Sequence, residues 1–342
     1  MASDERTEAD HLRRLRALAS EPRQFHLFQA LRILEAAYGN HPRLGRSFRP
    51  AEDPVRIGQQ VELAFPPVTI TEFQPADPAT GRRGRLAQLF FGLFGPMGPL
   101  PLHLTEYVRD RERNLRDRTL AAFADTFHHR MASLLYRAWA SAEPAPSFDR
   151  PDDDPFAEFV AALAGRRGAA FKRRDAMPDL AKLHFAGRLL HGPKNEEGLL
   201  AIVSGFFRAP CRIESFVGSW LELEPGDRSV LGRPAILGRT ASIGARVWSR
   251  QAKFRFRIGP LSLREYRRLL PGGDSLRRLV AIVRNYVGDA LDWDLNLVLA
   301  RGEAPPLVLG RQGQLGWTTW VGSAAAGREA DDLYLHPVIR EA

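Results

Sequence analysis

The sequence FGLFGPMGPLPLHLTE, residues 91–106, overlaps an uncharged stretch that runs from Leu86 to Leu104. This stretch is as long as a membrane-spanning helix, but three glycines and three prolines lie within it. At this density they would interrupt the backbone hydrogen bonds that a membrane span requires. We therefore expect no membrane insertion, and we interpret the stretch as an adhesive segment that packs against protein, in this chain or in a partner.

Helical periodicity flanks this segment on both sides. Upstream, the pattern predicts a helix over 22–38 that ends before Gly39, followed by short strands over 61–65 and 68–71. Downstream, we expect a charged helix over 104–116 and a second helix over 120–139. The second helix should turn one apolar face to the core, formed by Leu120, Phe123, Phe127, Met131, Leu134 and Ala138 and widened by Leu135 and Trp139.

Two segments lack the pattern of a packed element. Residues 74–85 are rich in proline, glycine and arginine, which predicts a projecting loop between Phe73 and Leu86. Residues 143–155 combine four prolines with an acidic run at 152–154, which is typical of a linker. The expected organisation is a first half over 1–142, a linker over 143–155 and a second half over 156–342.

The second half begins with short helices, expected over 156–163, 179–190 and 197–207, and then changes to strands. Apolar residues alternate with basic ones over 253–258, which predicts a half-buried strand with a basic outer face. Ser262 and Glu265 form a capping box, and Asp274 or Ser275 should cap the following helix. Further strands are expected over 295–299, 307–309 and 317–321.

The fold class is therefore α+β. The first half should be mainly helical with short strands and a projecting loop, and the second should hold a small antiparallel sheet with helices. The halves also share a faint order, because residues 54–57 echo 210–213 and the Gly-Pro-Leu turn at 98–100 echoes that at 259–261. This pattern suggests a weak internal duplication, although a few matched points could arise by chance.

The charge balance leaves a nucleic-acid partner open as the alternative function. The 342 residues carry a net charge of +9, and Arg supplies 45 of the 49 basic side chains. These arginines are scattered and often lie beside acids, and no Lys or Arg interrupts the aromatic residues of the 86–104 stretch. A surface surrounded by protein partners is the favoured interpretation.

Catalytic signatures are missing from the sequence, which contains no P-loop, nucleophile elbow, zinc-protease motif or Cys-x-x-Cys. His128 and His129 are neighbours on a predicted helix and point about 100° apart, so they suit one metal ion poorly. A single cysteine, Cys211, indicates a buried structural thiol in a reducing compartment. We expect no enzyme, cofactor or metal. A pocket of titratable groups around His103, Glu106 and Arg130 would change that view.

Several motifs, in their order along nearly the whole chain, carry a resemblance to a known family. The first motifs are FHLFQALRILE at 25–35, RIG at 56–58 and FP at 65–66, followed by the glycine- and proline-rich block at 91–106. Next come FADTFHHR at 123–130, LLYRAW at 134–139, FVGSW at 216–220, LG at 237–238, GPL at 259–261 and LPGG at 270–273. Together they resemble the TssG family of type VI secretion baseplate subunits, also called the ImpH or VasB family.

The resemblance implies a structural role in a contractile injection machine. Members form a cytoplasmic baseplate wedge with two copies of TssF, which TssE joins, and their loops hold TssK trimers. The wedge surrounds a VgrG hub and starts the sheath, and the baseplate docks near the inner membrane. The family is implied to have no catalytic site and no cofactor.

On this basis we expect the loop 73–86 to hold one TssK-like trimer. If the two halves are related, a loop around 225–236 would hold another. The 91–104 block and the neighbouring helices would bind TssF-like subunits. The candidate partner-binding residues are Phe73, Gln74, Arg82, Arg83, Arg85, Phe90, Phe91, Phe94, Pro96, Pro99, Leu100, His103 and Glu106.

Overall fold

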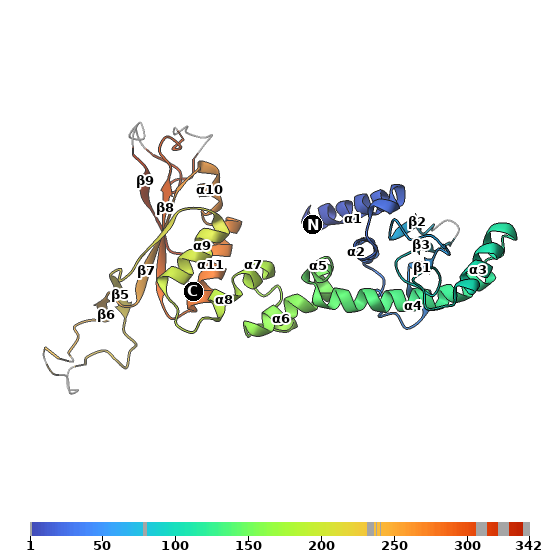
Figure 1. The fold of residues 1–342 in the computed structure, drawn as a ribbon. Coiled ribbons are helices and arrows are strands. Elements are labelled where there is room, and N and C mark those ends of the chain that lie inside the picture. The colour runs from blue at the N-terminus through green and yellow to red at the C-terminus, as the bar shows by residue number, and fades with distance from the viewer. Residues whose placement is uncertain are drawn as a thin grey trace. The chain divides into compact units, whose positions relative to one another are not determined.

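The computed structural model describes residues 2–77, 81–230, 236, 238–239, 241–305, 313–320 and 328–337. Its contacts divide the chain into two compact units, residues 1–157 and 158–342, and we describe each by itself. Both units combine helices with small sheets, so the expected α+β class is confirmed (Figure 1).

The first unit is mainly helical. The helices expected over 22–38, 104–116 and 120–139 are present with small shifts at their ends, whereas α1 was not expected from the polar start of the sequence. Its described elements are α1 (Ala2–Ser20), η1 (Pro22–Gln24), α2 (Leu27–Ala37), η2 (Pro50–Glu52), β1 (Val55–Gln59), β2 (Ile70–Gln74), β3 (Gly84–Gln88), α3 (Leu102–Asn114), α4 (Thr119–Ala142), α5 (Pro144–Phe148), η3 (Pro151–Asp153) and the start of α6 (Pro155–Leu163).

Three strands form the sheet of this unit in the order β1-β3-β2, with β1 parallel and β2 antiparallel to β3. The strand expected over 61–65 is absent, and the strand expected over 68–71 begins at Ile70. Residues 84–88, expected to lie in or beside the projecting loop, form the central strand instead. Phe73 and Leu86 pair across β2 and β3 and are both buried, so apolar burial extends the hairpin. Of the expected loop, only residues 75–83, which we call the hairpin tip, lie between the two strands in the sequence.

A buried polar network explains why residues 143–155 do not form a free linker. Glu35 on α2 accepts hydrogen bonds from Leu44 N at 3.0 Å, from Arg43 at 3.2 Å and from the Tyr136 hydroxyl of α4 at 3.1 Å. Arg43 also donates to the Pro146 carbonyl at 3.1 Å and pairs with Asp153 at 2.7 Å. The proline-rich segment therefore forms α5 and η3 and packs into the first unit.

The second unit contains a four-stranded sheet with the strand order β4-β7-β8-β9. It also contains a separate two-stranded sheet formed by β5 and β6. Helices α9 and α11 contribute Leu199, Ile202, Leu279 and Ile282 to the core of this unit. Its described elements are the rest of α6, η4 (Ala169–Phe171), α7 (Asp179–His184), α8 (Ala186–Leu190), α9 (Glu196–Phe207), β4 (Cys211–Glu214), β5 (Ser219–Glu222), β6 (Arg246–Ser249), β7 (Lys253–Leu261), α10 (Leu263–Arg268), α11 (Asp274–Val287), β8 (Asp292–Leu299) and β9 (Ala330–Leu335).

The sheet corrects several expectations. It is mixed rather than antiparallel, because β7 and β8 run parallel. Residues 317–320 form no strand, and β9 supplies the fourth strand; the strand expected over 307–309 lies outside the described residues. The capping box of Ser262 and Glu265 is confirmed, whereas Gly273 rather than Asp274 or Ser275 caps α11.

The faint repeat between the two halves is not matched by strand pairing. β1 pairs in parallel with β3, whereas the corresponding β4 pairs antiparallel with β7. Gly98-Pro99-Leu100 lies in an irregular loop, but Gly259-Pro260-Leu261 forms the end of β7. The shared order of elements therefore does not extend to a shared topology.

Candidate partner-binding surface

Buried glutamine side chains fix the loop that follows β3. Gln59 on β1 donates to the Phe94 carbonyl at 2.7 Å and accepts from Phe94 N at 2.9 Å. Gln88, at the end of β3, accepts from Phe91 N at 2.7 Å and donates to the Phe91 carbonyl. Each side-chain amide thus pairs with both backbone groups of one loop residue, as a neighbouring strand would. The loop 89–101 is irregular but held in one conformation.

The two adjacent histidines of α4 reach different segments. Leu93 N donates to His128 Nε2 at 3.0 Å, so the His128 proton lies on Nδ1, 3.0 Å from Asp125 Oδ1. Ile57 N donates to His129 Nδ1 at 3.2 Å, so His129 carries its proton on Nε2, 2.9 Å from an Asp53 carboxylate oxygen. The two histidines therefore adopt opposite tautomers, and each accepts a hydrogen bond from one backbone amide. Their role is structural, because His128 connects α4 to the loop at Leu93 and His129 connects α4 to β1 at Ile57.

Glycine is required at two points of this loop. Gly95 has φ +98°, a conformation that residues with a Cβ rarely adopt, and a Cβ on Gly98 would lie 2.5 Å from the Leu93 carbonyl oxygen. Thr105 Oγ1 accepts from Gly95 N at 3.2 Å and ties the loop to α3. The glycines of the 91–106 block are therefore needed for a tight loop that is fixed by hydrogen bonds to β1, β3 and α3.

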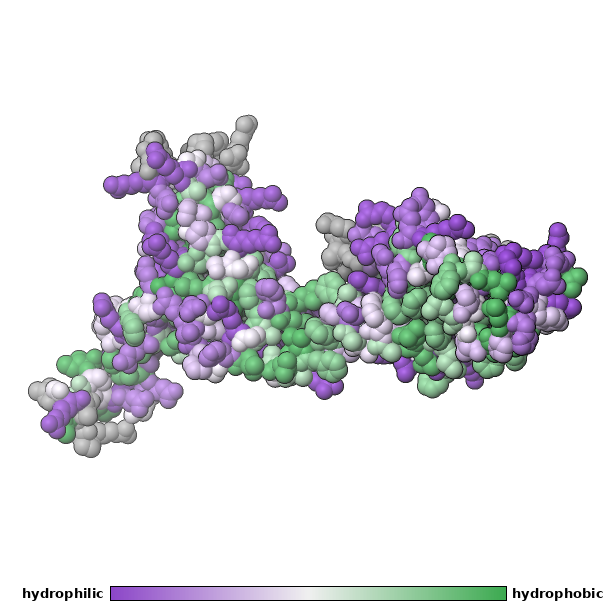
Figure 2. All heavy atoms as spheres, viewed as in Figure 1, coloured by the Kyte–Doolittle hydropathy of each residue, from purple (hydrophilic) through white to green (hydrophobic). Residues whose placement is uncertain are grey.

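The N-terminal part of the apolar stripe of α4 faces outward, which corrects the expected orientation of that part. Four members of the stripe are 42% to 61% exposed: Leu120, Phe123, Phe127 and Met131. Nearer the C-terminus, Leu134 and Leu135 are half-buried, and Trp139 packs against the core of the first unit. Most of the buried face consists of small residues and the two histidines, and α4 contacts β1 there: Ala121, Ala124, His128, His129, Ala132 and Ser133. Further along the same helix, the large side chain of Tyr136 is fully buried. Figure 2 shows apolar side chains gathered over α4.

The loop adds further apolar side chains beside this stripe. Phe90 is 46% and Met97 is 79% exposed, and both line a groove of about 450 Å³ together with Phe127 and Met131. We call Leu120, Phe123, Phe127, Met131, Phe90 and Met97 the α4 surface. A contiguous apolar area on rigid elements is typical of a protein interface.

The structure separates the residues that the sequence grouped as partner-binding. Phe73 and Phe94 are buried, which corrects their expected role as surface contacts of the free chain, and Phe91 and Leu100 are partly buried. Phe90, Pro96, Pro99, His103 and Glu106 are exposed. Near the hairpin tip, Arg82 donates to Gln74 and Arg83 to the Pro50 carbonyl, while Arg85 lies 3.6 Å from Asp125.

Sequence reasoning missed two exposed tryptophans in the second unit. Trp220 on β5 and Trp248 on β6 pair edge to face with ring centroids 5.3 Å apart, and they are 64% and 53% exposed. The sequence did not predict this contact because the two tryptophans are far apart along the chain, although Trp220 belongs to the FVGSW motif.

The geometry does not assemble the catalytic pocket that was considered. Arg130 lines a cavity of about 750 Å³ in the first unit, but neither His103 nor Glu106 does. Within the described residues, no group of three or more His, Cys, Asp or Glu side chains could hold a metal ion. Among the helices of the same residues, none is both long and apolar enough to cross a membrane.

An exposed apolar surface of this kind is typical of a protein-binding subunit. Comparison with known proteins identifies the family of this chain. The family model described as type VI secretion, TssG, matches residues 21–322, so the chain belongs to the TssG family. The resemblance seen in the motifs is thereby confirmed. TssG is a structural baseplate family, and this membership also confirms the expectation that the chain is not an enzyme.

Two solved structures share the fold. A chain in the baseplate complex from the type VI secretion system has a TM-score of 0.61 and 21% identity, with 97% of this chain and 94% of that chain covered. A chain in the cryo-electron microscopy structure of the TssK-TssF-TssG baseplate subcomplex has a TM-score of 0.52 and 22% identity, covering 60% and 88% respectively. No curated protein matches the chain significantly.

Proposed function

We propose that the chain is a scaffold of the type VI secretion baseplate and binds TssF-like subunits, two copies in the wedge, through the α4 surface. The exposed apolar stripe on α4 is the observation that carries this proposal. Its aromatic and aliphatic side chains are large, and full burial of each against a partner would contribute about 1.5–3 kcal/mol. The loop 89–101 is already ordered by the side chains of Gln59 and Gln88 before binding, which lowers the conformational entropy lost on association.

The solved structures support this assignment of partners. One similar chain belongs to a subcomplex with TssK and TssF, and the other to a whole baseplate complex. By the family resemblance we extend the proposal to a TssE-like subunit, to indirect contact with the VgrG hub and sheath, and to a cytoplasmic baseplate near the inner membrane.

We further propose that projecting loops hold TssK-like trimers. In the first unit this role falls to the hairpin tip around Arg82 and Arg83. In the second unit it falls to the segment 225–236, of which 231–235 lie outside the described residues. The exposed pair Trp220 and Trp248 lies on the hairpin from which that segment extends, and supports an adhesive role there.

The test of the α4 surface is co-expression with TssF- and TssK-like proteins followed by size exclusion. We expect co-elution of the wild type, and loss of the TssF-like protein in the double variant Phe123→Ser/Phe127→Ser. Leu12→Ser, which removes a 46% exposed side chain of α1, is the matched control and should bind normally. A separate monomeric peak of the wild type in the presence of both partners would contradict the proposal.

Deletion of residues 75–83, which leaves β3 intact from Gly84, tests the hairpin tip separately. The deletion should weaken binding of the TssK-like trimer and leave the TssF-like protein bound. Full affinity for the trimer after the deletion would remove the tip from the proposal.

Nucleic-acid binding is less well supported than it was from the sequence. Three carboxylates balance the three basic side chains on the outer face of β7. Arg255 and Lys253 both pair with Asp294, at 2.7 and 2.9 Å, and Arg255 also lies 3.5 Å from Glu214. Arg257 pairs with Asp331 at 2.9 Å. We expect no sequence-independent DNA binding at physiological salt. Binding that falls steeply with salt would favour the alternative.

A further inference from the structure

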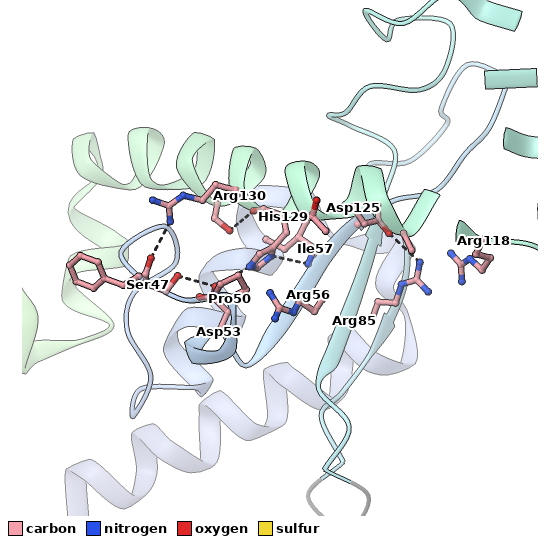
Figure 3. A pocket seen from close by; sticks show the side chains of 15 residues that line it. Ser47, Pro50, Asp53, Arg56, Ile57, Arg85, Arg118, Asp125, His129 and Arg130 are labelled. Atoms are coloured by element: carbon pink, nitrogen blue, oxygen red, sulfur yellow. Dashed lines mark hydrogen bonds and ion pairs between the residues drawn. The ribbon is translucent and has the colours of Figure 1, made fainter. Parts of the chain in front are cut away.

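A second cavity in the first unit differs in character from the groove beside the loop. Its volume is about 750 Å³, within the ~300–1,000 Å³ range of ligand pockets. None of the residues of the α4 surface lines it. Figure 3 shows polar and charged side chains along it beneath α4, from Ser47 and Asp53 at one end to Arg85 and Arg118 at the other.

Positive charge exceeds negative charge in this cavity. Four arginines line it (Arg56, Arg85, Arg118 and Arg130), against the two carboxylates of Asp53 and Asp125. Three of the arginines are engaged: Arg85 lies 3.6 Å from Asp125, Arg118 pairs with Glu112 at 2.9 Å, and Arg130 donates to the Ser47 carbonyl at 3.2 Å. His129 adds no positive charge in the neutral tautomer that its hydrogen bonds define.

Arg56 is the one of these four arginines whose side chain has no such ion pair or hydrogen bond among the described residues. Its backbone lies in the pairing of β1 with β3, and its side chain is half-buried. Burial and the positive charge of Arg83 lower the pKa of Arg56, partly offset by Asp53. A guanidinium placed in a cavity under these conditions offers bidentate donors to an incoming carboxylate.

Asp53 places an unpaired hydrogen-bond acceptor in the same cavity, in contrast to the unpaired donors of Arg56. It is only 4% exposed, and its Oδ2 accepts from His129 and Ser47 at 2.9 Å each. Its Oδ1 is buried without a hydrogen-bond partner among the described residues. A buried acceptor left in this state costs free energy, which a ligand N–H could recover.

We propose that this cavity binds an acidic peptide segment of a partner protein, with a carboxylate on Arg56 and a backbone N–H directed to Asp53 Oδ1. An acidic residue of a peptide carries both groups, the carboxylate on its side chain and the N–H on its backbone. A phosphate group offers mainly acceptors, so it would leave Asp53 Oδ1 without a donor. This inference rests on the proposed function, because the partner is a subunit of the same assembly, but it uses a site separate from the α4 surface.

Phe48 provides a position for testing the cavity. It lines the cavity and is 98% exposed, so a photoreactive p-benzoylphenylalanine can replace it without disturbing the core. The labelled full-length chain is purified with its TssF- and TssK-like partners, irradiated, and the cross-linked peptide is identified by mass spectrometry. We expect a partner segment that contains Asp or Glu near the cross-link.

Variants at Arg56 connect the cross-link to the charge. Arg56→Gln should lower the cross-link yield about tenfold while the complex still forms through α4. Arg56→Lys, which keeps the charge, should retain part of the yield. Arg16→Gln, which removes an exposed arginine of α1, should match the wild type, and circular dichroism should show that every variant is folded.

Each other outcome overturns the inference in a recognisable way. An intact complex without a partner cross-link, a cross-linked segment lacking acids, or a yield unchanged in Arg56→Gln would refute it. Cross-linking to co-purified nucleic acid would assign the cavity to that polymer. Stabilisation by inorganic phosphate alone, lost in Arg56→Gln, together with no partner cross-link would show a small-anion site. Failure of the wild-type complex to form at all would instead refute the proposed function.

Discussion

Asp53 is held in its charged form by its neighbours. Burial by itself would raise its pKa, but hydrogen bonds from His129 and Ser47 and the positive charge of Arg56 lower the pKa below its usual value. A carboxyl group with a depressed folded-state pKa stabilises the fold fully above its unfolded pKa of about 3.9. That contribution is lost as the pH falls through the folded-state pKa.

Asp53→Asn should therefore destabilise the first unit by about 2 kcal/mol at neutral pH, since a charge-assisted bond is lost. The difference from the wild type should shrink as the pH falls below about 4. Urea unfolding followed by circular dichroism over this pH range measures both effects. Asp10→Asn, at an exposed pair with Arg13, is the control. A difference that stays constant with pH would contradict the assignment.

Cys211 should be a slow thiol. It is partly buried, rather than fully buried as the sequence had suggested, and this partial burial in β4 raises its pKa to about 11. Little thiolate therefore exists at neutral pH. A disulfide-exchange reagent should react with the native chain much more slowly than with the chain unfolded in urea. Equal rates in the two states would show that the thiol is accessible and ionised. The sequence predicted an unreactive thiol, because no base lies near Cys211.

At the scale of elements, the loop 89–101 depends on buried amides outside it as well as on its own glycines. Gln59→Leu should release the Phe94 amide and speed its hydrogen exchange, while exchange in helix α11 of the second unit stays nearly unchanged. Hydrogen exchange with mass spectrometry measures this, and binding of the TssF-like protein should fall about tenfold. Gln60→Leu, one residue further and exposed, is the matched control. Unchanged exchange at Phe94 would show that the amide does not hold the loop.

Periodicity predicted most helices, but it could not decide which face of α4 is buried. The stripe from Leu120 to Met131 satisfies the pattern of a core face, and only contact with β1 shows that the opposite face is inside. Small residues with histidines at helical spacing, such as Ala121, Ala124, His128 and Ala132, were the available signal. β3 was missed because Gly84 and two preceding arginines suggested a loop, whereas the deciding Phe73–Leu86 pairing is non-local.

For the candidate site, the sequence located the 91–106 block and the exposed Phe90, Pro96 and Pro99. It could not show that Phe94 is buried, because this depends on the amide of Gln59, 35 residues away. It also gave no indication of the arginine-lined cavity, whose residues lie on η2, β1, β3, α4 and the turns between them.

At the scale of the whole molecule, the chain should unfold as two units. Each unit has its own core, with Tyr136 in the first and Tyr266 in the second among the fully buried side chains. Fragments 1–157 and 158–342 should each give a cooperative urea transition, and the intact chain should show both. The first fragment is best tested with Phe127→Ser to reduce self-association. A single shared transition, with both fragments unfolded, would contradict this division.

The outward stripe of α4 has a consequence for how the cell must supply this protein. A copy that has not met its partner carries aromatic side chains in water, and such chains aggregate or are captured by chaperones and proteases. We expect its lifetime in the cell to follow the abundance of the partner that covers α4 rather than its own rate of synthesis. The exposed apolar face of α4 thereby links the amount of this protein in the cell to the amount of its partner, because copies that remain unassembled are degraded.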